Sequence, residues 1–248
     1  MSSFEVVAHR GVPDEFPENT LPSFQRAIEL DADAVELDVR LTKDKVPVVY
    51  HYFYLQEATA LTGPIFDYTQ EQLHSAKIIG VESEDFFIPT LDDVLDSIGG
   101  RIGLEIEIKG PEPESSQIIA SVLNSRKPLW DSIEITSYEP ALLVDIKRRC
   151  PGIVTDLLIP RSEGWMGLDV VTYMAIQRAK LAGARAVHLH PTQLTEEVVR
   201  DIRGQGIEVH AWDVNDEDSL QLMYALSVPK ICTDSLRLAV DYRKRIGT

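Results

Sequence analysis

Acidic side chains interrupt two otherwise apolar segments of the sequence. Glu36 and Asp38 lie two residues apart in one segment, and Glu105 and Glu107 lie two residues apart in another. Alternate residues of a β-strand point to the same face, so each pair shares a face if its segment is a strand. Carboxylates that converge repel one another unless they are protonated or bind a cation. Hard oxygen ligands of this kind suit Mg²⁺ or Ca²⁺.

The same acids could instead pair with neighbouring cations. Lys109 shares a strand face with Glu105 and Glu107, and Arg10 and Arg40 belong to other predicted strand segments or follow them. Structural ion-pair networks and functional sites both gather buried charges. Spacing alone therefore leaves two interpretations open, a metal site and a buried layer of ion pairs.

Two histidines are predicted to reach the first acidic pair. His9 ends the first apolar segment of the chain, and residues 46–51 predict a strand that returns antiparallel after a turn. If the turn centres near Asp44, pairing places His51 opposite about residue 37, level with the acids.

These residue types suit the cleavage of a phosphodiester. One histidine beside a carboxylate-bound cation could activate the nucleophile, while the other protonates the leaving alkoxide. The metal ion, together with Arg10 and Lys109, would neutralise charge on the phosphoryl group. The convergence of two histidines with three acids favours the metal-site interpretation.

The elements that would position these residues alternate along the chain. Strands are predicted at 4–9, 33–41, 102–109, 132–136, 153–159, 186–190, 207–212 and 230–232. Helices are predicted at 20–30, 91–98, 115–124, 140–149, 169–182, 195–203, 216–226 and 236–246. Eight such units in about 250 residues predict an α/β fold of the (β/α)8 barrel type, in which active sites lie at the C-terminal ends of the strands. A doubly wound open sheet is the alternative.

One segment falls outside this alternation. The returning strand has no crossover helix before it, so it is predicted to form a β-hairpin with the second strand. A long connection at 52–89 follows, and we expect it to be a small insertion over the C-terminal barrel face, with a short helix at 69–77. The sequence contains no linker or low-complexity segment, which predicts a single domain over residues 1–248.

Composition narrows the classes of partner. The formal net charge of −16 disfavours nucleic acid, and it requires any phosphate site to be locally electropositive. No apolar run approaches the roughly 20 residues of a membrane-spanning helix, and no signal peptide is evident. Cys150 and Cys232 are expected to be reduced thiols, as in a cytoplasmic protein.

Several motifs resemble those of the glycerophosphodiester phosphodiesterases. The opening signature of that family is similar to Ala8-His9-Arg10-Gly11 followed by Pro17-Glu18-Asn19-Thr20. Its next motifs are similar to Glu36-Leu37-Asp38 through Asp44, Pro47 through His51, and Glu107-Ile108-Lys109. Later landmarks are similar to Ser137-Tyr138, Trp212-Asp213-Val214-Asn215 and Thr233-Asp234. The resemblance covers essentially the whole chain in the same order.

The resemblance implies a barrel enzyme that hydrolyses glycerophosphodiesters to glycerol 3-phosphate and an alcohol. It implies three ligands for a divalent metal ion, Mg²⁺ or Ca²⁺: Glu36, Asp38 and Glu107. It implies a catalytic pair, His9 and His51, and it implies substrate contacts from Arg10 and Lys109 at the phosphate and from Trp212 on the alcohol or glycerol side. The resemblance also selects Glu107 over Glu105 as the metal ligand. Strand geometry alone does not distinguish the two residues.

The chain departs from the family pattern where the leaving group is expected. Tyr52 stands where the family has Asp, Glu57-Ala58-Thr59 replaces Arg-Thr-Thr, and Asp213 replaces Thr. Loss of a basic residue near Glu57 argues against a second anionic group on the substrate.

Two further functions compete with this interpretation. Apolar residues of the insertion fit a lysophospholipase D-type enzyme acting on single-chain lipids: Phe53, Tyr54, Leu55 and Phe66. The departures also fit a barrel that binds phosphoesters without turning them over.

Structural roles are expected for three further polar residues. Asn19 is expected to serve the start of the following helix. His188 and His190 share one strand face, and a structural role is expected for each.

Overall fold

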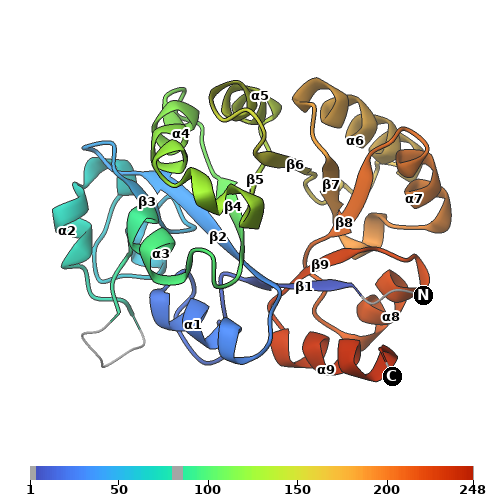
Figure 1. Cartoon of the computed structure of the whole chain (residues 1–248), viewed down its shortest axis with the longest axis horizontal. Coiled ribbons are helices and arrows are strands. Elements are labelled where there is room, and N and C mark those ends of the chain that lie inside the picture. The colour runs from blue at the N-terminus through green and yellow to red at the C-terminus, as the bar shows by residue number, and fades with distance from the viewer. Residues whose placement is uncertain (1–3, 80–85, 248) are drawn as a thin grey trace.

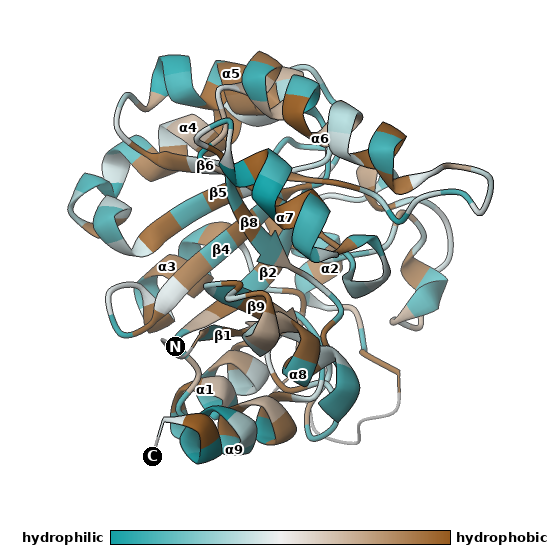
Figure 2. Ribbon diagram, turned by 90° about the vertical axis from the view of Figure 1, so that its right-hand side faces the viewer, coloured by the Kyte–Doolittle hydropathy of each residue, from teal (hydrophilic) through white to brown (hydrophobic). Residues whose placement is uncertain are grey.

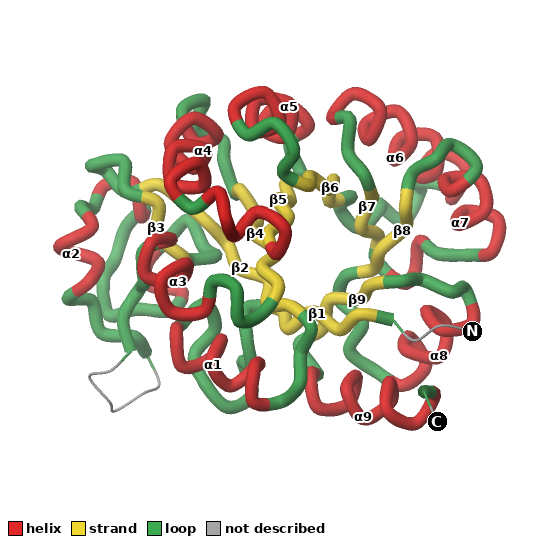
Figure 3. The backbone as a smooth tube through the Cα atoms, in the orientation of Figure 1, coloured by secondary structure: helices red, strands yellow, loops and turns green. Residues whose placement is uncertain are grey.

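A closed ring of parallel strands forms the centre of the molecule. The computed structural model describes residues 4–79 and 86–247. Within these residues, eight strands form the ring: β1 (Glu5–His9), β2 (Ala34–Leu41), β4 (Gly103–Ile108), β5 (Ile133–Ser137), β6 (Val154–Leu158), β7 (Ala186–Leu189), β8 (Glu208–Ala211) and β9 (Lys230–Thr233). Strand β1 pairs with both β2 and β9, which closes the ring (Figures 1 and 3). The predicted barrel is therefore confirmed, and the open sheet is excluded.

Helices surround the ring on its outer side (Figure 3). They are α1 (Leu21–Glu29), α3 (Leu91–Ile98), α4 (Ser115–Ser125), α5 (Pro140–Arg149), α6 (Leu168–Ala182), α7 (Glu196–Arg203), α8 (Glu217–Ala225) and α9 (Leu236–Ile246). Figure 2 shows hydrophobic and hydrophilic residues alternating along these outer helices. In α7, Val198 and Ile202 are buried while Glu197 is exposed, and the Thr195 hydroxyl accepts a hydrogen bond from Val198 N. Such apolar stripes cover the barrel, as the periodicity predicted.

Four short 3₁₀ helices lie in three connections of the described chain, and the sequence pattern did not predict them. They are η1 (Leu55–Glu57), η2 (Ile65–Asp67), η3 (Lys127–Ser132) and η4 (Pro191–Gln193). Each has only three to six residues, too few for a periodic pattern to appear. No helix among residues 4–79 and 86–247 is long and apolar enough to cross a membrane.

The predicted hairpin is present. Strand β3 (Pro47–Val49) runs antiparallel to β2, with Val39 opposite Val49 and Leu41 opposite Pro47. Beyond the strand, Tyr50 N donates to Asp38 O at 2.9 Å. This register places residue 51 opposite residue 37, as the position of the turn predicted.

The insertion packs around its own small core beside β2 and β3 (Figure 1). This core contains Val48, Tyr50, Leu55, Ile65, Leu73 and Ile88. The predicted helix at 69–77 is shorter in the structure, where α2 spans Gln70–His74. It ends early because the following residues become extended, so that Ala60 N donates to Lys77 O and Ile79 N donates to Ala58 O. Residues 80–85 of the predicted insertion lie outside the described residues.

Candidate active site

A sharp turn follows β1 and carries two of the predicted site residues. Arg10 has a φ of 55° and Gly11 a φ of 93°, both in the left-handed region. A Cβ atom at Gly11 would lie 2.3 Å from Ser23 Oγ, so only glycine fits here. The turn orients the Arg10 backbone N–H toward β2, and this N–H donates to Glu36 O at 3.0 Å.

Three buried carboxylates meet where β2 and β4 run side by side. Glu36, Asp38 and Glu107 each place an oxygen within 4.8 Å of the others. They converge because Asp38 and Glu107 are paired across the two strands and Glu36 lies two residues before Asp38. Glu105 points elsewhere in the barrel, where its Oε1 lies 3.3 Å from His188 Nδ1.

Two cations face this cluster. Arg10 Nε lies 3.1 Å from Asp38 Oδ2, and Lys109 Nζ lies 3.0 Å from Asp38 Oδ1 and 2.9 Å from Glu107 Oε2. The interpretation as a layer of ion pairs is thus partly realised. Arg40 does not join this layer: its Nε donates to His51 O at 2.8 Å, and its guanidinium lies over the Phe53 ring at 3.9 Å.

The cluster divides into one firmly ionised acid and two that hold protons easily. Burial would raise the pKa of Asp38, but Lys109 and Arg10 outweigh it and hold that pKa well below its usual range. Burial and the charge of Asp38 raise the pKa of Glu36 to about 8. Burial raises the pKa of Glu107 to about 7, although Lys109 opposes the shift. A proton or a metal ion therefore stabilises this arrangement.

The donor set fits a divalent metal ion. Glu107 Oε1 is buried and has no hydrogen-bond partner among the described residues, so it is available as a ligand. Asp38 Oδ1 is also buried, and its polar neighbour is the Lys109 ammonium. Three carboxylate oxygens without sulfur or imidazole are the donors preferred by Mg²⁺ and Ca²⁺.

His9 stands at the edge of the cluster and is held from behind by an acid. Its Nδ1 lies 2.6 Å from Asp234 Oδ1, and its Nε2 lies 3.9 Å from Glu36 Oε2. Burial lowers the pKa of His9, but the hydrogen bond with Asp234 and the charge of Glu36 outweigh it, so the pKa is raised. Because Nδ1 is occupied by Asp234, Nε2 is the nitrogen that faces the cluster.

The pKa of His51 is shifted in the opposite direction to that of His9. Burial lowers the pKa of His51 to about 3, and the charge of Asp38 opposes this shift only in part. Its Nδ1 is buried and makes no hydrogen bond within the described part of the chain. The Tyr52 ring packs edge-on against it at 4.7 Å. His51 is therefore neutral near pH 7 and has a free ring nitrogen.

The sequence-based role of Asn19 was wrong. Asn19 is buried, and its Nδ2 donates to Asp38 Oδ2 at 2.8 Å while its Oδ1 accepts from Asp38 N at 3.2 Å. Its φ of 58° turns the side chain away from the helix and toward Asp38. Thr20 occupies the N-cap position of α1 instead. The motif therefore orients an acid of the cluster.

Sequence reasoning also missed the role of Asp234, which it named only as a landmark. Asp234 follows β9, the neighbour of β1, and Asn215 Nδ2 donates to Asp234 Oδ2 at 3.1 Å. Trp212 follows β8 at the same end of the barrel. It packs against the buried group formed by Val7, Ala34 and Cys232, and its Nε1 donates to Ile159 O at 3.2 Å.

A cavity of about 280 Å³ lies between the first loop and the insertion. Its lining includes Asn19 and Tyr52, which also contact Asp38 and His51, so it adjoins the cluster. Glu18 and Glu57 give this cavity acidic walls.

Comparisons with known proteins show which family this chain resembles. The signature of the glycerophosphoryl diester phosphodiesterase family matches residues 9–238. A glycerophosphodiester phosphodiesterase of Caldanaerobacter subterraneus is 30% identical over 98% of this chain and 98% of that protein. One of Bacillus altitudinis is 29% identical over 98% of this chain and 99% of that protein.

Solved structures show the same fold. A phosphodiesterase of Oleispira antarctica, in complex with the product sn-glycerol-3-phosphate, is 25% identical, with a TM-score of 0.85 over 98% of this chain and 97% of that chain. A glycerophosphodiester phosphodiesterase of Thermotoga maritima is 27% identical, with a TM-score of 0.77 over 97% of this chain and 99% of that chain. The enzyme class expected from the sequence is confirmed. The chain belongs to the glycerophosphoryl diester phosphodiesterase family.

Proposed function

We propose that this enzyme hydrolyses glycerophosphodiesters to glycerol 3-phosphate and an alcohol, using a divalent metal ion and two histidines. The observation that carries the proposal is the position of His9 and His51 beside the buried cluster of Glu36, Asp38 and Glu107. Residues from separate parts of the chain meet at the C-terminal ends of barrel strands, where barrel enzymes place their active sites. The product bound to the similar protein of O. antarctica supports the same substrate class.

The proposed ligands of Mg²⁺ or Ca²⁺ are Glu36, Asp38 and Glu107. When bound, the ion supplies positive charge that offsets the charge on the phosphoryl oxygens. Arg10 and Lys109 lie against the same acids and are proposed to contact the phosphate. Together these groups provide the local positive potential that a protein with a net charge of −16 needs in order to bind an anion.

The histidines are proposed to divide the proton transfers. His51 is neutral because burial lowers its pKa, so it is proposed to take the proton of the attacking water. The raised pKa of His9 makes it the acid, whose Nε2–H donates to the leaving oxygen while Asp234 holds Nδ1. As the new O–P bond forms, the bond from phosphorus to the alcohol oxygen breaks. Overall, one water is consumed, and the alcohol leaves with the proton from His9.

A second candidate substrate is a single-chain lysophospholipid. Phe53, Tyr54 and Phe66 of the insertion have exposed fractions of 45%, 52% and 46%, which favours contact with an acyl chain. Leu55, which sequence reasoning included in this lining, is fully buried in the core of the insertion.

The test is hydrolysis of glycerophosphocholine and lysophosphatidylcholine, with glycerol 3-phosphate and choline measured in parallel. We expect glycerol 3-phosphate and choline from glycerophosphocholine, and we expect both to disappear with excess chelator. Faster release of choline from lysophosphatidylcholine would favour the second substrate. Tight binding without any turnover would instead indicate a barrel that only binds phosphoesters.

A further inference from the structure

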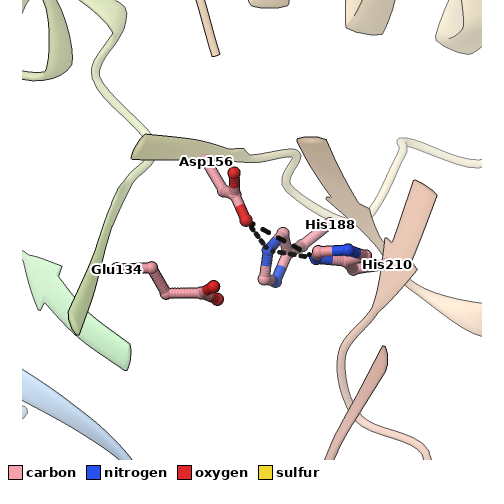
Figure 4. Close-up of side chains that lie close together, drawn as sticks. All are labelled: Glu134, Asp156, His188 and His210. Atoms are coloured by element: carbon pink, nitrogen blue, oxygen red, sulfur yellow. Dashed lines mark hydrogen bonds and ion pairs between the residues drawn. The ribbon is translucent and has the colours of Figure 1, made fainter. Parts of the chain in front are cut away.

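A second group of polar side chains lies inside the barrel, away from the proposed active site. Glu134 of β5, Asp156 of β6, His188 of β7 and His210 of β8 are all buried, and each places one atom within 4.8 Å of the others. Figure 4 shows the four side chains converging from four adjacent strands. The interior of a β/α barrel is ordinarily filled by branched apolar residues, so this group needs an explanation.

Three of the atoms have the spacing of ligands around one ion. Asp156 Oδ2 lies 3.2 Å from His188 Nε2 and 3.5 Å from His210 Nδ1, and the two nitrogens lie 3.1 Å apart. Ligands at about 2.0–2.1 Å from a tetrahedral Zn²⁺ are separated by roughly 3.3 Å. One carboxylate and two imidazoles therefore form one face of such a tetrahedron.

Glu134 offers the fourth position. Its carboxyl group points toward the ring of His188 (Figure 4). The Oε2 atom accepts from Arg185 at 2.7 Å and from Lys230 at 2.6 Å. The residue is only 8% exposed. Its Oε1 atom is buried and has no hydrogen-bond partner in the described chain. A buried carboxylate oxygen without a partner is costly unless something binds it.

The far nitrogen of each imidazole also faces a carboxylate. His188 Nδ1 lies 3.3 Å from Glu105 Oε1, and His210 Nε2 lies 3.4 Å from Glu208 Oε2. Metal-binding histidines usually donate their other N–H to a carboxylate, which fixes the tautomer and strengthens the ligand. Both histidines have this second partner in the structure.

The charges leave room for another cation. Three buried acids, Glu105, Glu134 and Asp156, face two cations, Arg185 and Lys230. Arg185 also binds Asp156, with Nη2 at 2.5 Å from Oδ2 and Nε at 3.2 Å from Oδ1. Burial and the charge of Glu134 raise the pKa of Glu105 well above its usual range, so a proton on Glu105 balances the charge when no metal ion is bound.

We propose that Glu134, Asp156, His188 and His210 bind a structural Zn²⁺ ion inside the barrel, separate from the ion of the active site. Imidazole nitrogens favour Zn²⁺ and related transition ions over Mg²⁺ and Ca²⁺. Four protein ligands leave no open position, which is typical of structural zinc. A cavity of about 270 Å³ borders the cluster at Glu134, and its lining also includes Glu105, Arg185 and Lys230.

Metal content tests this proposal without reference to catalysis. Untagged protein is loaded with Zn²⁺, exchanged into buffer with excess Mg²⁺, and analysed by elemental mass spectrometry. We expect about one Zn²⁺ per chain, and a tetrahedral absorption spectrum when Co²⁺ is used instead. His188→Gln/His210→Gln should lose this ion. The matched control is Glu36→Gln/Asp38→Asn at the active site, which should keep it.

A milder variant covers the case in which the double histidine variant does not fold. Glu208→Gln leaves all four proposed ligands in place and changes a half-exposed side chain, so the fold should persist. Its Zn²⁺ affinity, measured by chelator competition, should fall about tenfold or more, because it loses the carboxylate behind His210. Wild-type protein without bound Zn²⁺ would show that the cluster is only a hydrogen-bonded network. Unchanged Zn²⁺ content in a folded His188→Gln/His210→Gln variant, or unchanged affinity in Glu208→Gln, would also overturn the proposal.

Discussion

His9 Nδ1 lies 2.6 Å from Asp234 Oδ1, across 225 residues of sequence. The contact exists because the barrel closes between its first and last strands, so that the ends of β1 and β9 are neighbours. The carboxylate fixes the ring and raises the pKa of the imidazole. Closure of the fold thus completes a histidine–carboxylate pair.

The first prediction concerns this pair. Asp234→Asn should lower kcat by about tenfold to a hundredfold, less than the 10²–10⁴-fold usual for losing an acid or base itself. Because Asp234 raises the pKa of His9, its removal lowers that pKa, and the alkaline limb of the rate profile should move to lower pH. Profiles of kcat/KM against pH measure this shift. Asp213→Asn, a nearby acid that pairs with His190, should leave the limb in place. A wild-type profile for Asp234→Asn would remove the proposed role.

The second prediction separates the two histidines. His9→Ala and His51→Ala should each lower the rate by about 10²–10⁴-fold, and the double variant should fall well short of the product, because the two groups act together. A substrate that releases nitrophenolate needs little protonation of its leaving group. This substrate should restore the rate of His9→Ala, which lacks the acid, and should not restore the rate of His51→Ala, which lacks the base. The opposite pattern would exchange the roles, and near wild-type turnover in both variants would make the histidines structural.

The third prediction concerns the metal ligands. Activity should vanish with excess chelator and return with Mg²⁺ or Ca²⁺. Glu107→Gln should weaken binding of that ion far more than Glu105→Gln, because only Glu107 lies with Glu36 and Asp38. Titration calorimetry with Ca²⁺ measures both variants. Equal losses of affinity would show that the wrong residue of β4 has been assigned.

The fourth prediction concerns the pH dependence of metal affinity. Without metal, the pKa values of Glu36 and Glu107 are raised to about 8 and about 7, so both acids hold protons at lower pH. Bound metal requires both carboxylates to be ionised, so protons compete with it. Affinity for Ca²⁺ should therefore rise between pH 6 and pH 8, with protons released on binding. Constant affinity across this range would contradict the assignment of these two ligands.

The fifth prediction concerns the leaving group. Glu18 and Glu57 line the cavity beside His51 together with Tyr50 and Tyr52, and acids with aromatic rings suit a quaternary ammonium. Glycerophosphocholine should therefore be cleaved faster than glycerophosphoserine. Glu57→Gln should reduce the ratio of their kcat/KM values, whereas Glu71→Gln, an exposed acid of α2, should not. Equal rates of the wild-type enzyme on both substrates would remove the proposed preference.

The strands and helices of the barrel were predictable to within about two residues. The segment 102–109, for example, was predicted as a strand, and β4 spans Gly103–Ile108. This success has a physical cause, because strands buried on both faces have a strong apolar signal between turn residues. The insertion was less predictable, because its short 3₁₀ helices and extended pairs carry no period.

Residue spacing by itself predicted the parts of the candidate site that are close in sequence or in one hairpin. Glu36 and Asp38 were found from a spacing of two, and His51 from the centre of the turn. Asp234 was missed because no local pattern joins it to His9, although closure of a predicted barrel would have made their strands neighbours. Glu134 and Asp156 were missed although each is a charged residue within a predicted strand, the same signal that revealed Glu36.

The length of the turn between β2 and β3 determines where His51 lies. This turn is held by Thr42, whose hydroxyl donates to Asp44 Oδ1 at 2.6 Å and accepts from Val46 N at 2.9 Å. Because strand side chains alternate between faces, adding or deleting one residue here would turn the side chains of β3 to the other face and displace His51, which follows that strand. Exchange of insertions between relatives, as a route to new leaving groups, should therefore begin after Tyr52 and keep the turn at its present length.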